Sequence, residues 1–464
     1  LRLPLFSSNG LDHLYPWLLT ALAAAFLQRQ SPDGAFLSEY TRGLEQFQAG
    51  LARIDPGGMA EEIGLASGDL NRAADFLTGG KTAFVLGQDV LQQKYAGPCL
   101  DALLNLCLIS GGLSGGLGPG RNTVHLIARE NNLVGALDMG SVPGLLPGRL
   151  SIERPEDRAY WERIWKTKLS PDNGIDFFQM VIEAEKGNLK AMYIMGENPI
   201  RSLPQSARVQ KALDKLELII VQDILHTETT ELAHILLPGA PFAEKGGTFT
   251  NMEGRIQSFE AAIRPCGESR EDWRILDELS FRLGQKAYGS LQRIRSEIGR
   301  FVPMYSAADQ ASHPGYLPNA GLDPSRPLTF APLHIPEAES EDADFPFIAV
   351  IGNSRMHLGS GTRTANSRRI RKLPADGRPL CSEATARELN LKPEDRIRVV
   401  SRYGSIETEL QAEPTLEPGL IVIPLGFEHN RALNLIALSD AGHPERPESF
   451  GWTNCRVRLE PLGR

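Results

Sequence analysis

The residues best suited to chemistry lie at positions 219–257, where acidic, amide and hydroxyl side chains follow short apolar runs. Residues 218–221 are apolar and rich in β-branched side chains, which predicts a buried parallel strand. Gln222 and Asp223 come directly after this strand. An acidic side chain at the carboxyl end of such a strand is placed to bind a nucleotide ribose or base. We therefore expect Gln222 and Asp223 to belong to a nucleotide-binding site.

A helix and a second strand are predicted after Asp223. Thr227 is a typical residue for the start of a helix, and the helical pattern continues to about His234. The apolar run 235–237 follows and ends at Pro238. The alternative interpretation is a generic strand–helix–strand unit, in which Asp223 and Thr227 only cap the helix.

A polar, glycine-rich loop is expected over residues 244–255. It carries Glu244 and Lys245, which could pair as an acid and a base or could position the loop. His226 and His234 lie on the predicted helix, but their eight-residue spacing suits a single metal site poorly. We therefore interpret the two histidines as solvated or core residues.

Two further predicted strands, 81–87 and 191–195, also lead into polar residues. The first ends at residues 87–89, and the second ends at Gly196, Glu197 and Asn198. Strands and helices alternate in this region, which predicts an α/β fold with a doubly wound, mostly parallel sheet. Ligands bind beyond the carboxyl ends of such strands. We therefore expect all three strand ends, including Gln222 and Asp223, to converge on one site.

Helices are predicted for much of the remaining N-terminal part of the chain. They cover residues 10–52 apart from a turn at 31–34, a buried stretch at 99–109, and residues 156–190 and 205–215. The glycine-rich segment 111–120 would let a backbone approach a ligand closely, but it is equally typical of a flexible connector.

The chain changes character after residue 302. Residues 303–344 are rich in Pro, Ser, Asp and Glu, which predicts a surface linker. Beyond it, strand patterns occur at 397–401, 405–410 and 419–424. We therefore predict an α/β region at 1–302, a linker at 303–344 and a β domain at 345–464.

Composition and charge exclude several functions. The net charge of −8 argues against nucleic acid as a partner. The five cysteines form no CxxC pair, so the sequence shows no cluster-binding or zinc motif and fits a reducing cytoplasm. The apolar run 14–27, interrupted by Pro16, is too short to span a bilayer and is not arranged as a signal peptide. The chain starts at Leu1 without a methionine, which indicates a longer or a processed polypeptide.

The ordered pattern QD-x3-TET, followed by EK-x-GTFTN-x-EGR-x-Q, resembles the molybdopterin oxidoreductase family. Within that family the chain looks most like the C-terminal part of two proteins, the formate dehydrogenase large subunit and the large iron–sulfur subunit of NADH:quinone oxidoreductase (complex I). Residues 129–140 and 143–148 are a second match. The resemblance extends from Leu1 to Arg464 and implies an α/β region followed by a cofactor-binding β-barrel.

The barrel's best marker is a loop that carries His357, Ser360, Gly361, Thr362 and Thr364. Small and hydroxyl-bearing residues there would let backbone N–H groups and side chains cradle a phosphate or the edge of a pterin. A polar turn between strands is the alternative interpretation. Residues 426–430 and Asn434 lie where a later cofactor loop of the family falls.

The resemblance implies a molybdopterin guanine dinucleotide cofactor with molybdenum or tungsten, bound between the strand ends and the barrel. Asp223 and Thr227 would hold its guanosine, and the loop from His357 to Thr364 would hold its pterin. Two-electron chemistry at the metal would pass electrons to iron–sulfur clusters. Such clusters, and the thiol or selenol that binds the metal, would belong only to an N-terminal segment or to partner subunits, so we assign no metal ligand to this chain.

Two departures from the formate dehydrogenase pattern favour a different role. Where those enzymes carry a substrate-orienting arginine this chain has Ala128, with Arg129 one residue later, and Gly359 replaces a histidine. Alanine cannot make a bidentate contact to formate. Residues 265–273 fit the pattern PxGxxREDW of the complex I subunit, which favours the complex I type.

The sequence therefore predicts a cytoplasmic electron-transfer oxidoreductase subunit of a multi-subunit complex, complex I-like or formate-dehydrogenase-like. Its partners would be iron–sulfur proteins and NADH- or quinone-side proteins, and it would reach a membrane only through them. The alternative is a non-catalytic scaffold that keeps the fold with an empty cofactor site. Ala128, Gly359 and the lack of a metal-binding thiol motif favour the scaffold, whereas Asp223 and Thr227 favour the redox subunit.

Overall fold

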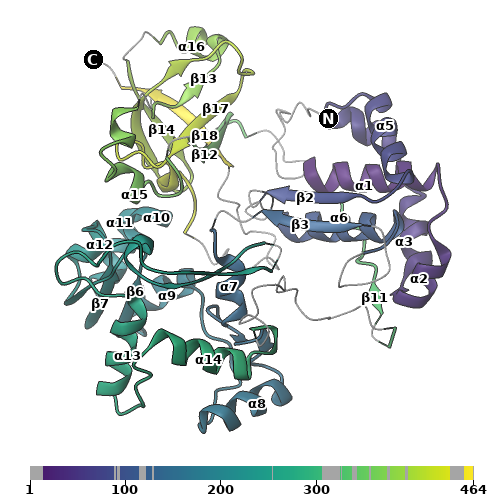
Figure 1. Ribbon diagram of the computed structural model, residues 1–464. Helices are drawn as coiled ribbons and strands as arrows, with labels where there is room; N and C mark the ends of the chain where they lie inside the picture. The colour runs from purple at the N-terminus through teal and green to yellow at the C-terminus, as the bar shows by residue number, and fades with distance from the viewer. Residues whose placement is uncertain are drawn as a thin grey trace. The chain divides into compact units, whose positions relative to one another are not determined.

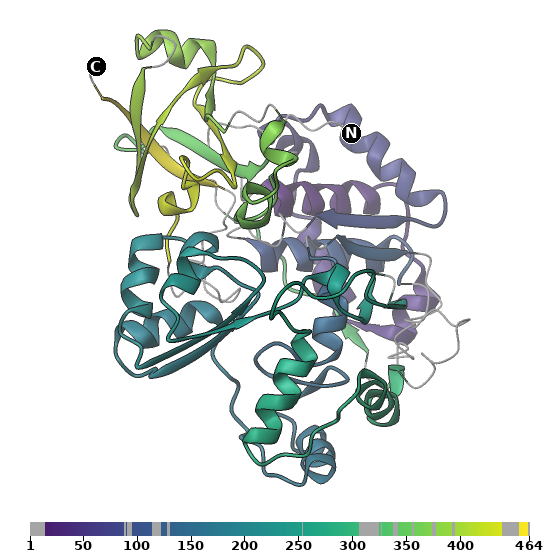
Figure 2. The ribbon, with the colours of Figure 1, turned by 60° about the vertical axis from the view of Figure 1, so that its left-hand side comes forward.

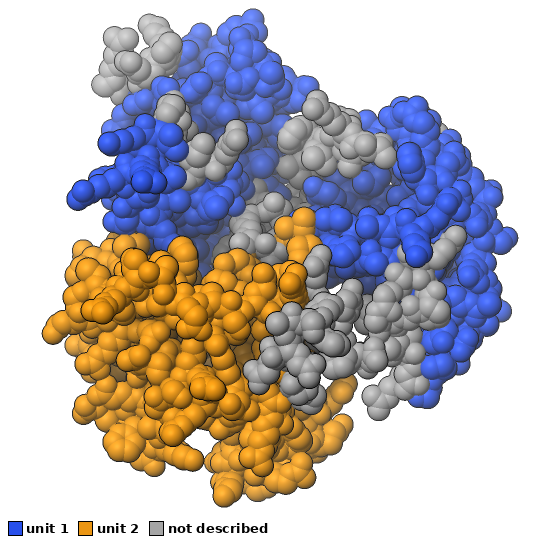
Figure 3. All heavy atoms as spheres, viewed as in Figure 1, with its two compact units in different colours: residues 1–126, 201–206, 321–464 blue, residues 127–200, 207–320 orange. Residues whose placement is uncertain are grey.

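The computed structural model describes residues 14–87, 90, 95–113, 122–127, 130–252, 254–305, 324–325, 327–336, 342–354, 357–373, 377–391, 395–438 and 454–462. The chain forms two compact units (Figure 3). Unit 1 comprises residues 1–126, 201–206 and 321–464, and unit 2 comprises residues 127–200 and 207–320.

The N-terminal part of unit 1 is built on the apolar helix α1 (Leu14–Leu27), which packs against α6 (Ala96–Ile109). Phe26 and Leu106, one from each helix, are buried in the same core. Strands β2 (Ala83–Gly87) and β3 (Thr123–Ile127) form a two-stranded sheet nearby (Figure 1). The remaining helices of this part are α2 (Gly34–Tyr40), α3 (Leu44–Leu51), α4 (Pro56–Glu62) and α5 (Ser67–Thr78). These elements confirm the predicted helices at 99–109 and, from residue 14 onward, at 10–52.

Part of the predicted surface linker is packed into this core. Strand β11 (Leu328–Thr329) pairs in parallel with β1 (Thr41–Arg42). Phe330 is 5% exposed and stacks on Phe47, with 4.9 Å between the ring centroids. Residues 328–330 of the predicted surface linker therefore pack into the core instead, because the stretch 327–336 is mostly apolar, unlike the rest of 303–344.

Unit 2 contains a parallel sheet in the order β6 (Ala191–Met195), β7 (Leu218–Asp223) and β8 (Ile235–Pro238). Ile219 and Val221 of the central strand are buried, as the β-branched run predicts. Helices α9 (Phe177–Glu185), α10 (Pro199–Ser202), α11 (Ser206–Leu213) and α12 (Glu228–Glu231) adjoin these strands in the chain. The alternation of strands and helices confirms the predicted α/β class.

The helix predicted over 156–190 is two helices, α8 (Pro155–Trp165) and α9. Lys166 ends α8 in a left-handed conformation, with φ of 55°. The turn-forming residues 171–174, Pro-Asp-Asn-Gly, follow it. Such residues favour turns over helix, which explains why the single-helix prediction is wrong.

The predicted polar loop at 244–255 contains most of a β-hairpin. The short helix η3 (Phe242–Glu244) precedes strand β9 (Gly247–Thr250), which pairs antiparallel with β10 (Ile256–Phe259). Phe249 and Phe259 stack with their ring centroids 4.7 Å apart. The loop prediction is wrong for residues 247–250, because alternating side chains on each side of a glycine-containing turn favour strand pairing. Residues 251–252 and 254–255 lie between the two strands, as the loop prediction expects. Unit 2 also contains β4 (Leu145–Leu146), β5 (Leu150–Ser151), α13 (Asp272–Arg282), α14 (Leu291–Phe301) and η4 (Pro303–Tyr305).

The C-terminal part of unit 1 is a seven-stranded, nearly closed barrel with the strand order β15-β14-β18-β12-β17-β13-β16. Figures 1 and 2 show its strands curving around a common interior. The strands are β12 (Phe347–Asn353), β13 (Leu380–Cys381), β14 (Arg396–Ser401), β15 (Ser405–Glu409), β16 (Gln411–Ala412), β17 (Leu420–Leu425) and β18 (Asn454–Pro461). Ile397, Val399, Ile421 and Ile423 fill the barrel core. The strand patterns at 397–401, 405–410 and 419–424 thus predicted β14, β15 and β17 correctly, whereas β12, β13, β16 and β18 were not predicted.

The barrel's helical elements are α15 (Thr362–Ala365), η5 (Ile370–Lys372), α16 (Glu383–Glu388) and η6 (Ala432–Leu435). Among all the residues that the structure describes, no helix has both the length and the apolar character that crossing a bilayer requires. The same residues contain no group of three or more His, Cys, Asp or Glu side chains arranged to hold a metal ion.

Candidate functional site

The carboxyl ends of β6 and β7 bring two predicted loops together. These strands are parallel neighbours, with Met195 aligned to Gln222. The amide of Gly196 donates to the carbonyl of Gln222 at 2.8 Å, and Gly196 has a left-handed φ of 66°. The third predicted strand end does not join them in this sheet, because β2 pairs with β3 in another sheet. Gln88 and Asp89 lie outside the described residues.

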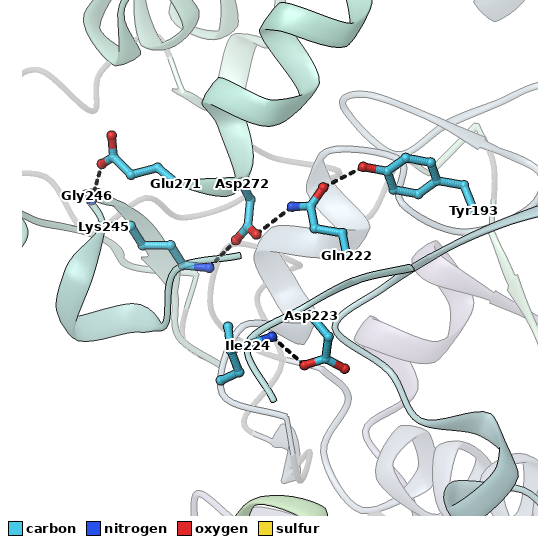
Figure 4. Close-up of polar contacts among 8 residues, drawn as sticks. All are labelled: Tyr193, Gln222, Asp223, Ile224, Lys245, Gly246, Glu271 and Asp272. Carbon is cyan, nitrogen blue, oxygen red and sulfur yellow. Dashed lines mark hydrogen bonds and ion pairs between the residues drawn. The ribbon is translucent and has the colours of Figure 1, made fainter. Parts of the chain in front are cut away.

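Gln222 is the centre of a hydrogen-bonded chain at this edge (Figure 4). The hydroxyl of Tyr193 donates to Gln222 Oε1. Gln222 Nε2 in turn donates to Asp272 Oδ1 at 2.7 Å, and Lys245 Nζ donates to Asp272 Oδ2. Gln222 is buried, and both ends of its side-chain amide have hydrogen-bond partners. These two hydrogen bonds fix the orientation of the amide. Burial, and then the charge of Asp272, raise the pKa of Tyr193.

Glu244 and Lys245 face different partners. Glu244 Oε2 accepts from the amide of Cys266 at 2.9 Å, whereas Lys245 pairs with Asp272. The amide of the next residue, Gly246, donates to Glu271 Oε1 at 3.1 Å (Figure 4). The two side chains are therefore paired with other residues and not with each other, and the interpretation that they position the loop fits these contacts.

Asp223 is oriented by its own backbone turn. Its Oδ1 accepts from the amide of Ile224 at 2.6 Å and from the amide of Leu225 at 3.3 Å. Within the described part of the chain, Oδ2 has no hydrogen-bond partner, and the side chain is half-buried. The carboxylate thus keeps one oxygen that is held in position and can accept hydrogen bonds from a ligand.

Thr227 caps the helix α12, as the sequence predicts, but the helix is shorter than expected. Thr227 Oγ1 accepts from the amide of Thr230 at 3.2 Å, and Thr230 Oγ1 accepts from the amide of Thr227 at 2.8 Å. The helix ends at Glu231, so neither His226 nor His234 lies on it. His234 Nδ1 instead accepts from the amide of Ile219 at 3.0 Å, which gives this histidine a structural partner.

Asn198 connects the end of β6 to α12. Its Oδ1 accepts from Thr229 Oγ1 at 2.7 Å, and its Nδ2 donates to Glu228 Oε2 at 2.8 Å. The amide of Asn198 donates to Glu197 Oε1 at 3.0 Å. Asn198 is buried, whereas Gly196 and Glu197 are exposed. Asn198 therefore holds the strand end and the helix together, and Gly196 and Glu197 form the open side of the loop.

The barrel loop places His357 against Thr364. His357 Nδ1 lies 2.8 Å from Thr364 Oγ1, and the His357 ring centroid lies 4.5 Å from that of Phe427. Burial, and then the charge of Arg201, lower the pKa of His357, so its neutral form is favoured. Arg201 Nε also donates to the carbonyl of Ser360 at 2.8 Å.

Two glycines let this loop approach its neighbour. Gly361 has φ of 76°, and a Cβ added to it would lie 1.9 Å from the carbonyl oxygen of Gly426. Gly361 also caps α15, whose Thr362 Oγ1 lies 3.0 Å from Ser360 Oγ. Gly426 has φ of 97°. A side chain at 361 would therefore separate the two loops.

Asn430 and Asn434 follow Gly426 in the chain. Asn434 Oδ1 accepts from the amide of Ser206 at 2.9 Å. Asn430 is buried, and its Nδ2 donates to the carbonyls of Gly377 and Pro424, each at 3.0 Å. Its Oδ1 is buried with no partner among the described residues. A buried acceptor without a partner fits a ligand or water that donates to it.

The second sequence match, around residues 129–140, is anchored by buried Asp138. Asp138 accepts from Arg149 Nε at 2.7 Å and from Tyr305 at 3.1 Å. Burial, with the nearby charge of Asp138, raises the pKa of Tyr305 to about 12. Asn132 Oδ1 accepts from the amide of Thr250 on β9 at 2.9 Å. Ala128 and Arg129, which the sequence analysis singled out, lie outside the described residues, as does most of the 111–120 segment.

Two family profiles match the chain. The molybdopterin oxidoreductase profile matches residues 18–282, and the molybdopterin dinucleotide-binding profile matches residues 347–445. The first match covers more than half of the chain. The chain belongs to the molybdopterin oxidoreductase family. The second match supports a molybdopterin cofactor for this family member.

Curated relatives of this molybdopterin oxidoreductase are named as dehydrogenases or oxidoreductases. The F420-dependent formate dehydrogenase subunit alpha of Methanocaldococcus jannaschii is 30% identical over 88% of this chain and 63% of its own length. The NADPH-Fe(3+) oxidoreductase subunit alpha of Geobacter sulfurreducens is 31% identical over 91% of this chain and 47% of its own length. Formate dehydrogenase H of Escherichia coli is 25% identical over 96% of this chain and 65% of its own length. The chain thus spans about half to two thirds of these relatives.

The fold is similar to that of a solved structure. Acetylene hydratase from Pelobacter acetylenicus aligns over 97% of this chain and 70% of its own length, with a TM-score of 0.71 and 16% identity. At that identity the likeness shows the fold alone.

Two members of the network, Tyr193 and Asp272, are not among the site residues predicted from the sequence. Asp272 was visible in the PxGxxREDW pattern at 265–273, but we used that pattern only to compare relatives. Tyr193 lies in the middle of a strand, where its type and spacing resemble core. Contacts between distant residues, rather than a local motif, reveal both.

Proposed function

We propose that this molybdopterin oxidoreductase is a pterin-binding electron-transfer subunit of a multi-subunit redox complex. The observation that carries the proposal is the edge formed by β6 and β7. There the Asp223 carboxylate is fixed through Oδ1 and presents Oδ2 next to the partly buried Gln222–Asp272–Lys245 network. The names of the relatives, which are formate dehydrogenase and NADPH-Fe(3+) oxidoreductase subunits, support a redox role.

The residues of unit 2 fit the nucleotide end of a molybdopterin guanine dinucleotide. Guanine presents an N1–H and an exocyclic amino group on one edge, and a carboxylate oxygen accepts hydrogen bonds from such donors. In this proposal Asp223 Oδ2 accepts from the guanosine. Lys245 has three N–H donors, so it can pair with Asp272 and still donate to a phosphate. Thr227 stabilises this edge by capping α12.

The barrel loop fits the pterin side of the cofactor. The glycine contact at Gly361 keeps the loop free of bulk, and Ser360, Thr362 and Thr364 offer hydroxyl groups. His357 is favoured as a neutral imidazole, which avoids a buried charge beside Arg201. Asn434 fixes the neighbouring backbone through Ser206, and Asn430 keeps an unpaired acceptor. When bound, the molybdenum or tungsten pterin supplies two-electron chemistry.

The proposal extends to the chain's surroundings. Iron–sulfur clusters would lie on an N-terminal segment or on partner subunits, and the partners would be redox proteins. The relatives named above favour a formate-dehydrogenase-like complex over the complex I type that residues 265–273 favour. We propose a cytoplasmic location, with membrane contact only through partners.

A second candidate is a scaffold with an empty site. The observation that favours it is that several predicted ligands already have protein partners: Thr227 caps α12, Asn198 bonds Thr229, and Asn434 bonds Ser206. Metal and nucleotide analysis of the native protein separates the two candidates. Molybdenum or tungsten together with GMP released by acid hydrolysis supports the redox subunit, and the absence of both supports the scaffold.

A further inference from the structure

A cationic surface lies next to the barrel loop. Residues 345–375 contain no Asp or Glu, although the whole chain has a net charge of −8. Inside that segment, the ten residues 363–372 contain five cations: Arg363, Arg368, Arg369, Arg371 and Lys372. We call these five residues the 363–372 cationic surface. None of these five side chains is among the proposed pterin ligands, which are His357, Ser360, Gly361, Thr362 and Thr364.

The backbone gathers these cations into a compact turn. Helix α15 and η5 contact each other, and the amide of Arg371 donates to the carbonyl of Ser367 at 3.0 Å. Asn366 Nδ2 donates to the carbonyl of Thr362 at 2.8 Å. The turn is therefore held by its own hydrogen bonds, and the cationic side chains are not needed to maintain it.

All five side chains are exposed, and none forms an ion pair within the described part of the chain. Other arginines of the barrel do form ion pairs. Arg398 lies 2.8 Å from Glu407, and Arg402 lies 2.6 Å from Asp342. The contrast indicates a surface whose positive charge is left for an external anion.

The composition of this surface favours carboxylates on a protein. Four of the five cations are arginines, whose planar guanidinium pairs with two carboxylate oxygens at once. Residues 357–373 contain no Phe, Tyr or Trp to stack on nucleic-acid bases or to enter a membrane interface. Leu358 and Leu373 are 66% and 41% exposed and add apolar area of the kind that protein interfaces bury.

We propose that the 363–372 cationic surface docks a small acidic electron-carrier protein. The inference rests on the proposed redox function for the identity of the partner. The surface is continuous with the barrel loop, because Arg363 lies between Thr362 and Thr364 in α15. A carrier bound there would lie beside the loop that we assign to the pterin. Complementary charge would speed the encounter and orient the carrier.

The test is a binding titration of the native holoprotein with a plant-type [2Fe–2S] ferredoxin, a strongly acidic carrier. The test variant combines R368E, R369E and R371E. The control combines R53E, K211E and K286E, which reverse three exposed charges in other elements and give the same change in net charge. At low salt the test variant should raise Kd by on the order of tenfold or more and flatten its salt dependence. The control should stay within about twofold of wild type, because its three charges lie outside the proposed docking surface and cannot pair with the carrier's carboxylates there.

Three results would overturn the proposal. Equal effects of the two variants would show that only net charge matters. Loss of bound GMP in the test variant would assign the cations to the cofactor's phosphates. Tighter binding to vesicles of equal parts phosphatidylserine and phosphatidylcholine than to the ferredoxin would assign them to a membrane. The titration measures ferredoxin binding and needs no catalytic turnover. A protein without cofactor would therefore contradict the proposed function, but the docking proposal would still be decided by the measured Kd values.

Discussion

The ammonium group of Lys245 pairs with the carboxylate of Asp272, which lies 27 residues further along the chain. The other oxygen of the same carboxylate accepts from Gln222, so Asp272 joins the loop before β9 to the end of β7. Both members of the ion pair are roughly 70% buried. An ion pair in this setting is screened less than a surface pair, and it restrains the loop that carries Lys245.

The first prediction concerns Asp272→Asn. The amide keeps the size of the side chain but removes the charge that holds Lys245, so we expect the free energy of unfolding to fall by about 1–2 kcal/mol. Bound GMP should fall as well, because the loop is less restrained. Urea denaturation and GMP analysis measure the two effects. Asp214→Asn is the matched control and should change neither, because the Asp214 side chain is exposed and forms no hydrogen bond or ion pair within the described part of the chain. An unchanged GMP content in Asp272→Asn would remove Asp272 from the site.

The second prediction separates the two roles of Asp223. An asparagine can still accept from the amide of Ile224, so Asp223→Asn should leave the free energy of unfolding within about 0.5 kcal/mol of wild type. The variant loses the carboxylate, however, and the N–H donors of its amide can then face the N–H donors of guanine, with which they form no hydrogen bond. We therefore expect weaker GMP retention with normal stability. A variant with full GMP content would show that Asp223 only closes its turn.

Sequence patterns predicted the sheet edge because strand and cap signals are local. The β-branched run before Gln222 and the cap at Thr227 each depend on neighbouring residues, and both are confirmed. Strand β9 of the hairpin was misread as part of the loop 244–255, because its glycine and threonines are compatible with either structure until the strands pair. Phe330 was misread because burial depends on a distant helix core.

The site was harder to predict than the fold. Asp223, Gln222 and Lys245 follow from motif and position, but their roles as ligands stay predictions. Tyr193 and Asp272 enter the network only through contacts made across 27, 29 and 50 residues of chain. Local spacing carries no signal for such pairs, so the sequence could indicate the region of the site and not its hydrogen-bonded centre.

The third prediction tests the close approach of two barrel loops. Gly361→Ala would place a Cβ 1.9 Å from the carbonyl oxygen of Gly426 and would force alanine into a left-handed conformation. We expect a loss of about 2–4 kcal/mol in the free energy of unfolding, from the backbone strain and the overlap together. Gly352→Ala on β12 is the control, because no heavy atom lies within 4 Å of its added Cβ. Equal stability of the two variants, measured by thermal or urea unfolding, would refute the close contact.

The fourth prediction concerns pH. Burial and Arg201 lower the pKa of His357 in the folded protein, so the unfolded chain binds the proton more readily. Stability should therefore fall as the pH drops below about 6.5, the ordinary histidine pKa, until the lowered folded-state pKa is reached. His357→Gln should weaken this dependence, and the control His226→Gln, at an exposed histidine, should keep it. Urea denaturation at a series of pH values measures the difference. Identical pH profiles for wild type and His357→Gln would contradict the account.

The most direct test of the central claim is the metal and nucleotide content of the native protein. Mass spectrometry measures molybdenum and tungsten, and acid hydrolysis releases GMP from a pterin guanine dinucleotide. A redox subunit with a bis-pterin site should contain about one metal atom and two GMP per chain. Neither metal nor GMP in the native assembly would contradict the redox assignment and leave this molybdopterin oxidoreductase as a scaffold that keeps the family's fold.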